Sequence, residues 1–162
     1  MLRWLWLSAG VLVLDHITKW LAVAYLSDRP PITIFSWFDL QLVYNRGAAF
    51  GLLSKAGGWQ IYFFAVIGIV VCLAIVYYLR KLQSHETQIA IAFALILGGA
   101  VGNLFDRIYQ GYVVDFIHWF YQGWHWPNFN IADSAITIGA VLLLMDAVGW
   151  RLFGSKEAQE SD

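Results

Sequence analysis

The stretch that decides the fold is GGWQIYFFAVIGIVVCLAIVYYLR, residues 57–80, which carries no charged side chain before its final arginine. A helix rises about 1.5 Å per residue and the hydrocarbon core of a bilayer is about 30 Å thick, so about 20 apolar residues cross it. Residues 87–106 form a second such segment, and a short polar hinge at 81–86 separates the two. The sequence therefore predicts two adjacent transmembrane helices.

Two further segments, residues 4–26 and 134–153, are apolar except for a few ionisable side chains. These are Asp15, His16, Lys19, Asp146 and Arg151. The first segment also has features of a secretory signal peptide, because Arg3 precedes an apolar run and small residues follow at 22–24. Asp15 and Lys19 would lie between that run and a cleavage site, which favours a permanent span. Asp146 is expected to snorkel to the headgroups.

The composition agrees with a chain that lipid covers. Apolar residues make up 60% of the 162 residues, charged residues only 13%, and the mean hydropathy is +0.61. A soluble domain carries about 25% charged residues. A net charge of −1 provides no basic field for nucleic acid, and a single cysteine excludes an intramolecular disulfide. We predict an all-α integral membrane protein with four transmembrane helices, forming one membrane-embedded domain over residues 1–162.

Four spans place both termini on one side of the membrane. The short segments on that side hold five basic residues, whereas the much longer loops 27–55 and 106–133 hold four. Because short cytoplasmic segments are enriched in Lys and Arg, the termini are expected to be cytoplasmic. Residues 32–35, 39–44 and 113–117 are rich in β-forming residues, which predicts a small sheet at the outer surface.

Ionisable side chains at membrane depth require a partner or a function. Asp15 and Lys19 are four residues apart, so they share a helical face and are expected to form a structural ion pair. Lys19 as the general base of a serine nucleophile is an alternative. Asn103, Asp106 and Arg107 also share one face, at the end of a span in which Gly98 and Gly102 permit close helix packing.

Asp115 and Asp133 are expected to meet near the outer headgroups, although they come from different elements. Asp133 as a simple N-cap of the last span is the alternative. Two neighbouring carboxyls cannot both ionise cheaply and therefore share a proton, the state that aspartic proteases use. A metal site on Asp115 and His118, with His125 nearby, is a further but poor alternative, because His-Glu-x-x-His and similar metal-binding motifs are missing from the sequence.

Five motifs in order and in register resemble lipoprotein signal peptidase, also called signal peptidase II, over about residues 3–153. They are DHITK at 15–19, NRGAAF at 45–50, GGAVGNLFDR at 98–107, GYVVDF at 111–116 and FNIADS at 129–134. The resemblance implies a bacterial inner-membrane aspartic protease that cleaves prolipoproteins just before a diacylglyceryl-modified cysteine. It also implies four transmembrane helices, a small extracytoplasmic sheet and a short surface helix.

The resemblance assigns roles to individual residues. Asp115 and Asp133 correspond to the catalytic pair, and Asp15 and Lys19 to the structural pair of the first helix. The residues that it implies in substrate binding or support of the catalytic pair are Asn45, Arg46, Gly47, Asn103, Asp106, Arg107, Asn130 and Ala132. The loop at residues 52–59 is a candidate lid over the site.

Partners and location are also implied by the resemblance. The expected partners are lipidated prolipoproteins, membrane lipid and cyclic peptide inhibitors of the globomycin type, and neither a metal nor an organic cofactor is implied. The active site is expected on the periplasmic side. Two other functions remain open at this point: a small proton-coupled transporter using the carboxylates at 15, 106 and 133 with Lys19, and a structural membrane adaptor.

Overall fold

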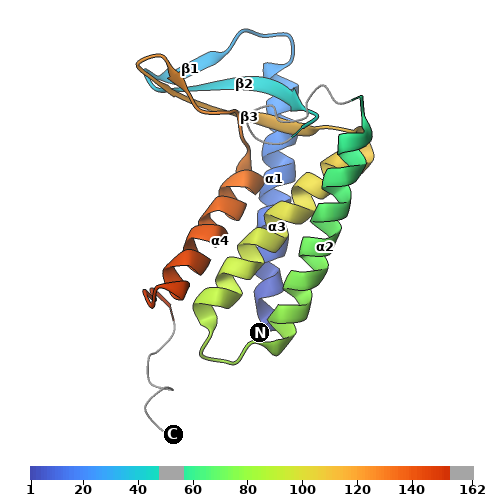
Figure 1. Cartoon of the computed structure of the whole chain (residues 1–162). Helices are drawn as coiled ribbons and strands as arrows, with labels where there is room; N and C mark the ends of the chain where they lie inside the picture. The colour runs from blue at the N-terminus through green and yellow to red at the C-terminus, as the bar shows by residue number, and fades with distance from the viewer. Residues whose placement is uncertain (48–56, 154–162) are drawn as a thin grey trace, which may run out of the picture.

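The computed structural model describes residues 1–47 and 57–153 of the chain. These residues form helices that run side by side and a sheet that lies across one end of them (Figure 1). The helical elements are η1 Leu2–Trp4, α1 Leu5–Leu26, α2 Trp59–Lys81, α3 Thr87–Gln110 and α4 Ile131–Ala147. The strands are β1 Ile32–Phe35, β2 Phe38–Asn45, β3 Val113–Tyr121 and β4 Trp124–His125. The N-terminus lies at the end of the bundle away from the sheet.

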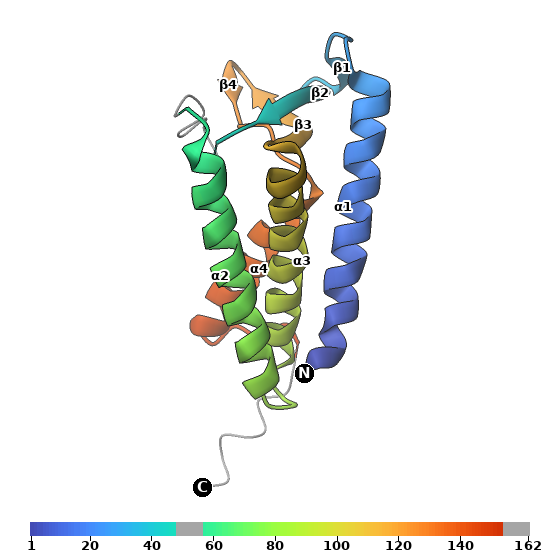
Figure 2. The same ribbon diagram turned by 90° about the vertical axis from the view of Figure 1, so that its right-hand side faces the viewer.

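Helix α3 is the centre of the bundle and packs against α1, α2 and α4 (Figure 2). Its glycines allow the backbones to touch. A Cβ added at Gly98 would lie 2.7 Å from the Ser8 carbonyl oxygen of α1, and one at Gly99 would lie 2.3 Å from the Ala132 carbonyl oxygen of α4. These distances are shorter than any carbon–oxygen contact, so only glycine fits at both positions. The close packing that the Gly98–Gly102 spacing predicts is present at Gly98.

Three helices are long and apolar enough to cross a membrane within the described part of the chain. They cover Leu2–Leu26, Trp59–Lys81 and Thr87–Gln110, and they match the predicted spans 4–26, 57–80 and 87–106. Helix α1 packs along α3 and α4 and buries Asp15 and Lys19 against them. This packing is that of an integral helix of the bundle, which favours the permanent span over the signal peptide.

The last predicted span, 134–153, differs from the helix that forms. Helix α4 begins at Ile131 because Asn130 caps it, and it ends at Ala147, shortly before Gly149 adopts a positive φ of 78°. Its 17 residues extend about 26 Å at 1.5 Å per residue, just under the thickness of the hydrocarbon core. Asp146 follows near the end of this helix, and its Oδ1 accepts from Arg151 Nε at 2.9 Å.

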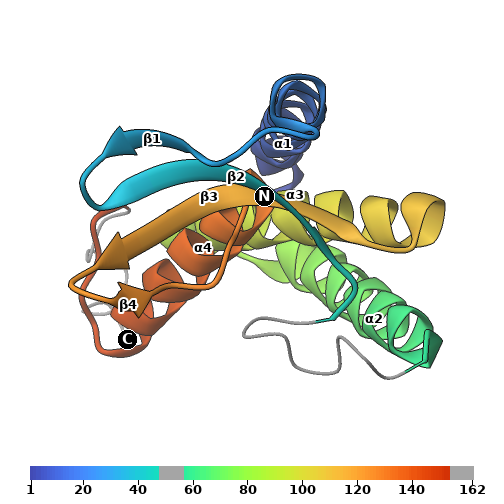
Figure 3. The same ribbon diagram turned by 90° about the horizontal axis from the view of Figure 1, so that it is seen from above.

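The predicted small sheet is present and is larger than expected. Four antiparallel strands lie in the order β1-β2-β3-β4, across the ends of the helices when viewed from above (Figure 3). Strand β3 pairs with β2 in a register that sets Val43 opposite Asp115. Phe116 packs on Ala22 and Leu26 of α1, which anchors the sheet to the bundle. Apart from η1, residues 1–47 and 57–153 contain no short surface helix of the kind that the resemblance implies.

Candidate active site

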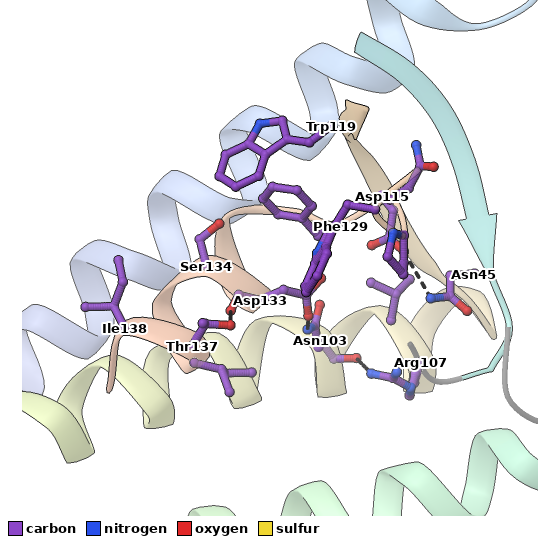
Figure 4. Close-up of a pocket in the computed structure, with 15 residues that line it drawn as sticks. Asn45, Asn103, Arg107, Asp115, Trp119, Phe129, Asp133, Ser134, Thr137 and Ile138 are labelled. Atoms are coloured by element: carbon purple, nitrogen blue, oxygen red, sulfur yellow. Dashed lines mark hydrogen bonds between the residues drawn. The ribbon is translucent and has the colours of Figure 1, made fainter. Parts of the chain in front are cut away.

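Asp115 and Asp133 reach one cavity from two different elements, β3 and the first turn of α4 (Figure 4). Asp115 is buried, with 2% of its surface exposed. Asp133 is the third residue of α4, so its carboxylate lies at the positive end of the helix dipole. The predicted convergence of these two acids at the sheet end of the bundle is therefore what the fold produces.

Asn130 binds both carboxyl groups. Its side-chain Nδ2 donates to Asp115 Oδ1 at 2.8 Å, and its backbone N–H donates to Asp133 Oδ2 at 3.2 Å. Its Oδ1 accepts from the backbone N–H of Asp133 at 2.9 Å, which completes a capping box. Asn130 is thus the N-cap of α4, and the alternative in which Asp133 is the N-cap is wrong.

Each carboxyl group receives a second amide donor. Asn45 Nδ2, at the end of β2, donates to Asp115 Oδ2 at 3.0 Å. Asn103 Nδ2, from α3, donates to Asp133 Oδ1 at 2.7 Å. Asparagine carries no net charge, so these contacts hold the carboxyl groups in place without neutralising them.

Burial and a neighbouring acid change the titration of Asp115. Burial raises the pKa of Asp115 from 3.8 to about 7, and the negative charge of Asp133 adds to the increase. The hydrogen bonds from Asn45 and Asn130 and the charge of Lys19 oppose the increase without cancelling it. Asp115 therefore titrates near neutral pH, as a carboxyl group that shares a proton with a neighbour does.

Arg107 fixes the turn that follows β2. Its Nη1 donates to the Asn103 carbonyl at 3.2 Å and its Nη2 donates to the Gly47 carbonyl at 3.3 Å, while its guanidinium lies 5.5 Å from the Phe64 ring centre. The Gly47 N–H donates to Asn45 Oδ1 at 2.9 Å, which orients the Asn45 amide. Arg46 in this turn is exposed. Arg107 thus supports this turn through backbone carbonyls, and it also lines the cavity that holds the two acids.

The cavity has a volume of about 490 Å³ and joins a polar end to an apolar end. Asn45, Asn103, Arg107, Asp115 and Asp133 form the polar end. The apolar end is formed mainly by Val113, Trp119, Trp126, Pro127, Phe129, Ile136 and Ile138. The sequence-based prediction did not include Trp119 and Trp126. Strand alternation could have identified Trp119, because residues 115 and 119 point to the same face of a strand.

The predicted structural pair forms part of a larger ion cluster. Lys19 Nζ lies 2.7 Å from Asp15 Oδ2, 2.8 Å from Asp106 Oδ2 and 3.0 Å from Asn103 Oδ1. Asp15 Oδ1 accepts from the Ala132 N–H at 2.9 Å, which ties α1 to the first turn of α4. These three acceptors occupy the hydrogen-bonding positions of the Lys19 ammonium, so the geometry does not support Lys19 as a general base.

Two further sequence-based hypotheses concern a metal site and a lid. His118 faces away from Asp115, because residues three apart on a strand lie on opposite faces, and its ring pairs with Asp39 at 2.7 Å and His125 at 3.1 Å. Residues 1–47 and 57–153 contain no group of three or more His, Cys, Asp or Glu side chains arranged so that they could hold a metal ion. Of the candidate lid at 52–59, residues 52–56 lie outside the described part of the chain.

A transporter would need a polar path through the bundle. The ion cluster does connect Asp15, Lys19 and Asp106. Further from the sheet, however, α1 and α3 are in backbone contact at Ser8 and Gly98, where even a methyl group would clash. This contact disfavours a proton path between these two helices.

Comparison with known proteins gives a consistent result. A family model described as signal peptidase (SPase) II matches residues 7–149. The lipoprotein signal peptidase of Pseudomonas aeruginosa is 48% identical, with 99% of this chain and 93% of that protein covered. That of Pseudoalteromonas atlantica is also 48% identical, with 90% and 88% covered. A structure described as a bacterial membrane enzyme is 31% identical with a TM-score of 0.79, covering 91% of this chain and 88% of its own. The chain belongs to the signal peptidase II family.

Proposed function

We propose that this protein is a membrane aspartic endopeptidase that removes the signal peptide from prolipoproteins, with Asp115 and Asp133 as its catalytic pair. The observation that carries the proposal is that Asn130 hydrogen-bonds to both carboxyl groups at the polar end of one cavity. Family membership supports the reaction, and this geometry supports the choice of residues.

In the proposed mechanism the two acids divide the proton chemistry. Both acids accept two N–H donors, but only Asp133 lies in the first turn of α4, where the helix dipole favours a negative charge, so we assign it as the ionised member that takes a proton from the attacking water. Asp115, with its pKa raised to about 7, is the protonated member that polarises the peptide carbonyl and then protonates the leaving amine. No metal is needed for these steps.

The cavity suggests how the substrate lies. The scissile peptide would occupy the polar end, beside the turn at Asn45 to Gly47 and the first turn of α4 at Ala132. The diacylglyceryl chains on the cysteine would remain in lipid, next to the apolar end at Ile136 and Ile138. A cyclic peptide of the globomycin type would compete for the same cavity.

The proposed topology has four spans, with α4 and the turn after it as the shortest. Both termini are then cytoplasmic in the bacterial inner membrane, and the sheet and the catalytic pair face the periplasm. The density of basic residues at the ends of the helices away from the sheet supports this orientation. The whole chain acts as one membrane-embedded peptidase domain.

The decisive experiment measures cleavage of a diacylglyceryl-modified prolipoprotein by the purified protein in detergent. Asp115→Asn and Asp133→Asn should each lower kcat at least about 1000-fold, because neither amide can exchange a proton. The matched control is Asp39→Asn, an acid of the same sheet that pairs with His118, which should retain activity. Near-normal cleavage by either active-site variant would overturn the catalytic assignment. A chelator should leave the wild-type rate unchanged.

A further inference from the structure

The buried ion cluster of α1 contacts the candidate catalytic residues through a single amide. Lys19 is 4% exposed, and its ammonium meets the carboxylates of Asp15 and Asp106 and the Oδ1 of Asn103. Burying charges in this way is expensive, and apolar side chains would stabilise a helix bundle at least as well. The cluster therefore calls for an explanation besides stability.

The side-chain amide of Asn103 has an oxygen that accepts hydrogen bonds and a nitrogen that donates them, and each of the two atoms faces a suitable partner. Its Oδ1 accepts from Lys19 Nζ at 3.0 Å and from Asn130 Nδ2 at 3.3 Å, whereas its Nδ2 donates to Asp133 Oδ1 at 2.7 Å. An ammonium group can only donate hydrogen bonds, and an ionised carboxylate can only accept them. If the amide were flipped, its NH₂ group would face the Lys19 ammonium and its oxygen would face the Asp133 carboxylate, and neither contact could be a hydrogen bond. Lys19 therefore excludes the flipped orientation.

We propose that Lys19 is a positioning residue for the reaction, which holds the Asn103 amide with its N–H directed at Asp133. This inference rests on the proposed function. Lys19 does not contact the reacting atoms; it acts through Asn103, which stabilises the ionised form of the acid that activates water. Asp15 and Asp106 hold Lys19 in position from α1 and α3.

All charged groups around Asn103 must be considered when the pH dependence is interpreted. Lys19 and Asp15 face it from α1, Asp106 and Arg107 are its neighbours on α3, Asp115 faces it from β3 and Asp133 from α4. Residues 59–79 of α2 carry no Asp, Glu, Lys, Arg or His. Loss of Lys19 removes a cation that opposes the raised pKa of Asp115, whereas loss of Asp15 and Asp106 removes two negative charges that act in the opposite sense, so the pH profile of a variant that lacks all three charges should move little.

The test is a double-mutant cycle. Lys19→Met alone would leave two buried carboxylates unpaired, so the cluster is replaced as a unit by Asp15→Asn, Lys19→Met and Asp106→Asn together. The asparagine introduced at position 15 would still offer an acceptor to the Ala132 N–H. This cluster variant and Asn103→Ala are assayed singly and combined, with kcat, KM and the pH profile measured on a diacylglyceryl-modified prolipoprotein.

We expect the cluster variant to lower kcat about 10- to 100-fold, the usual effect of losing a hydrogen bond to a charged group, with KM little changed. Because kcat is expressed per folded protein, a loss of folded protein alone would not produce this decrease. In the Asn103→Ala background the cluster substitutions should lower kcat no further. The control pair Asp146→Asn with Arg151→Met removes an ion pair at the other end of α4 and should leave kcat unchanged.

Two results would overturn the proposal. The first is a wild-type kcat in the folded cluster variant. The second is that the cluster substitutions lower kcat by the same factor in the wild-type and Asn103→Ala backgrounds. Asp133→Asn is assayed in parallel to keep two failures apart. If Asp133→Asn is active, the proposed function itself fails. If it is inactive and the cycle is additive, only the positioning role of Lys19 fails.

Discussion

Two pairs of carboxyl groups lie near the sheet end of the bundle, three of the four buried and Asp133 half-buried, and the protein stabilises the pairs differently. Asp15 and Asp106 form ion pairs with the same lysine, whose Nζ (Lys19) lies 2.7 Å from Asp15 Oδ2 and 2.8 Å from Asp106 Oδ2. Asp115 and Asp133 are bound by asparagines, at 2.7–3.2 Å. A buried cation offsets the negative charge of a carboxyl pair, whereas neutral amides leave the repulsion between two carboxylates in place. The first arrangement fixes helices together; the second leaves a proton to exchange.

The largest effect on stability is expected from breaking the charged arrangement. Lys19→Met should lower the free energy of unfolding by about 3–5 kcal/mol, because it leaves two carboxylates buried without a counterion. Thermal unfolding in detergent measures this loss. The cluster variant, in which asparagine replaces both acids, is the matched comparison and should recover most of the stability. If the Lys19→Met protein were as stable as wild type, the two carboxylates would not need the lysine as a counterion.

Asp115, a member of the pair bound by asparagines, should make the free energy of unfolding depend on pH. Since the folded pKa of Asp115 is about 7 and its unfolded value is 3.8, the folded state binds the extra proton between these values. The stability from this proton is complete below pH 4 and is lost as the pH rises towards 7. The loss should amount to a few kcal/mol by the usual conversion of pKa shifts.

The comparison of wild type with Asp115→Asn isolates this contribution. The variant cannot titrate at residue 115, so its unfolding temperature should rise relative to wild type as the pH increases from 4 to 7.5. Parallel curves for wild type and Asp115→Asn would mean that Asp115 is ionised normally in the folded protein.

The charged arrangement was easier to predict from sequence than the amide arrangement. Asp15 and Lys19 lie on one helix with a spacing of four, so local geometry already pairs them. The participation of Asp106 depends on how α1 and α3 pack, and packing between helices is not encoded in local spacing. Likewise, Asp115 and Asp133 were grouped because both were expected at the outer surface, but the bridging contacts of Asn130 required the three-dimensional fold.

The boundaries of elements show the same limit. The long apolar helices were predicted to within a few residues because hydropathy alone determines them. Helix α4 begins three residues before the predicted start, since the Asn130–Asp133 capping box decides its beginning. Strand β4 has only two residues and depends on pairing with β3, which its short sequence does not reveal.

A glycine substitution probes the space on which the ion cluster depends. A Cβ at Gly102 would lie 2.7 Å from Asp15 Oδ2, an oxygen that Lys19 holds in place. Gly102→Ala should therefore lower stability by about 1–3 kcal/mol, the usual range for overpacking. Gly10→Ala on α1 is the control, because nothing lies within 4 Å of a Cβ there; it should be neutral or stabilising. Equal effects of the two substitutions would argue against close packing at Gly102.

The smallest effect is expected at the ion pair that lies outside both arrangements. Asp146 and Arg151 form their contact at 2.9 Å while remaining partly exposed, so Asp146→Asn should change stability by less than about 1 kcal/mol. Gln88 holds the same end of the chain differently: it is buried and bonds the backbone of Leu142, Trp150 and Leu152. Gln88→Leu should cost more, because it leaves buried backbone groups without partners. If Asp146→Asn were the more damaging change in thermal unfolding, charge rather than burial would control this end of α4.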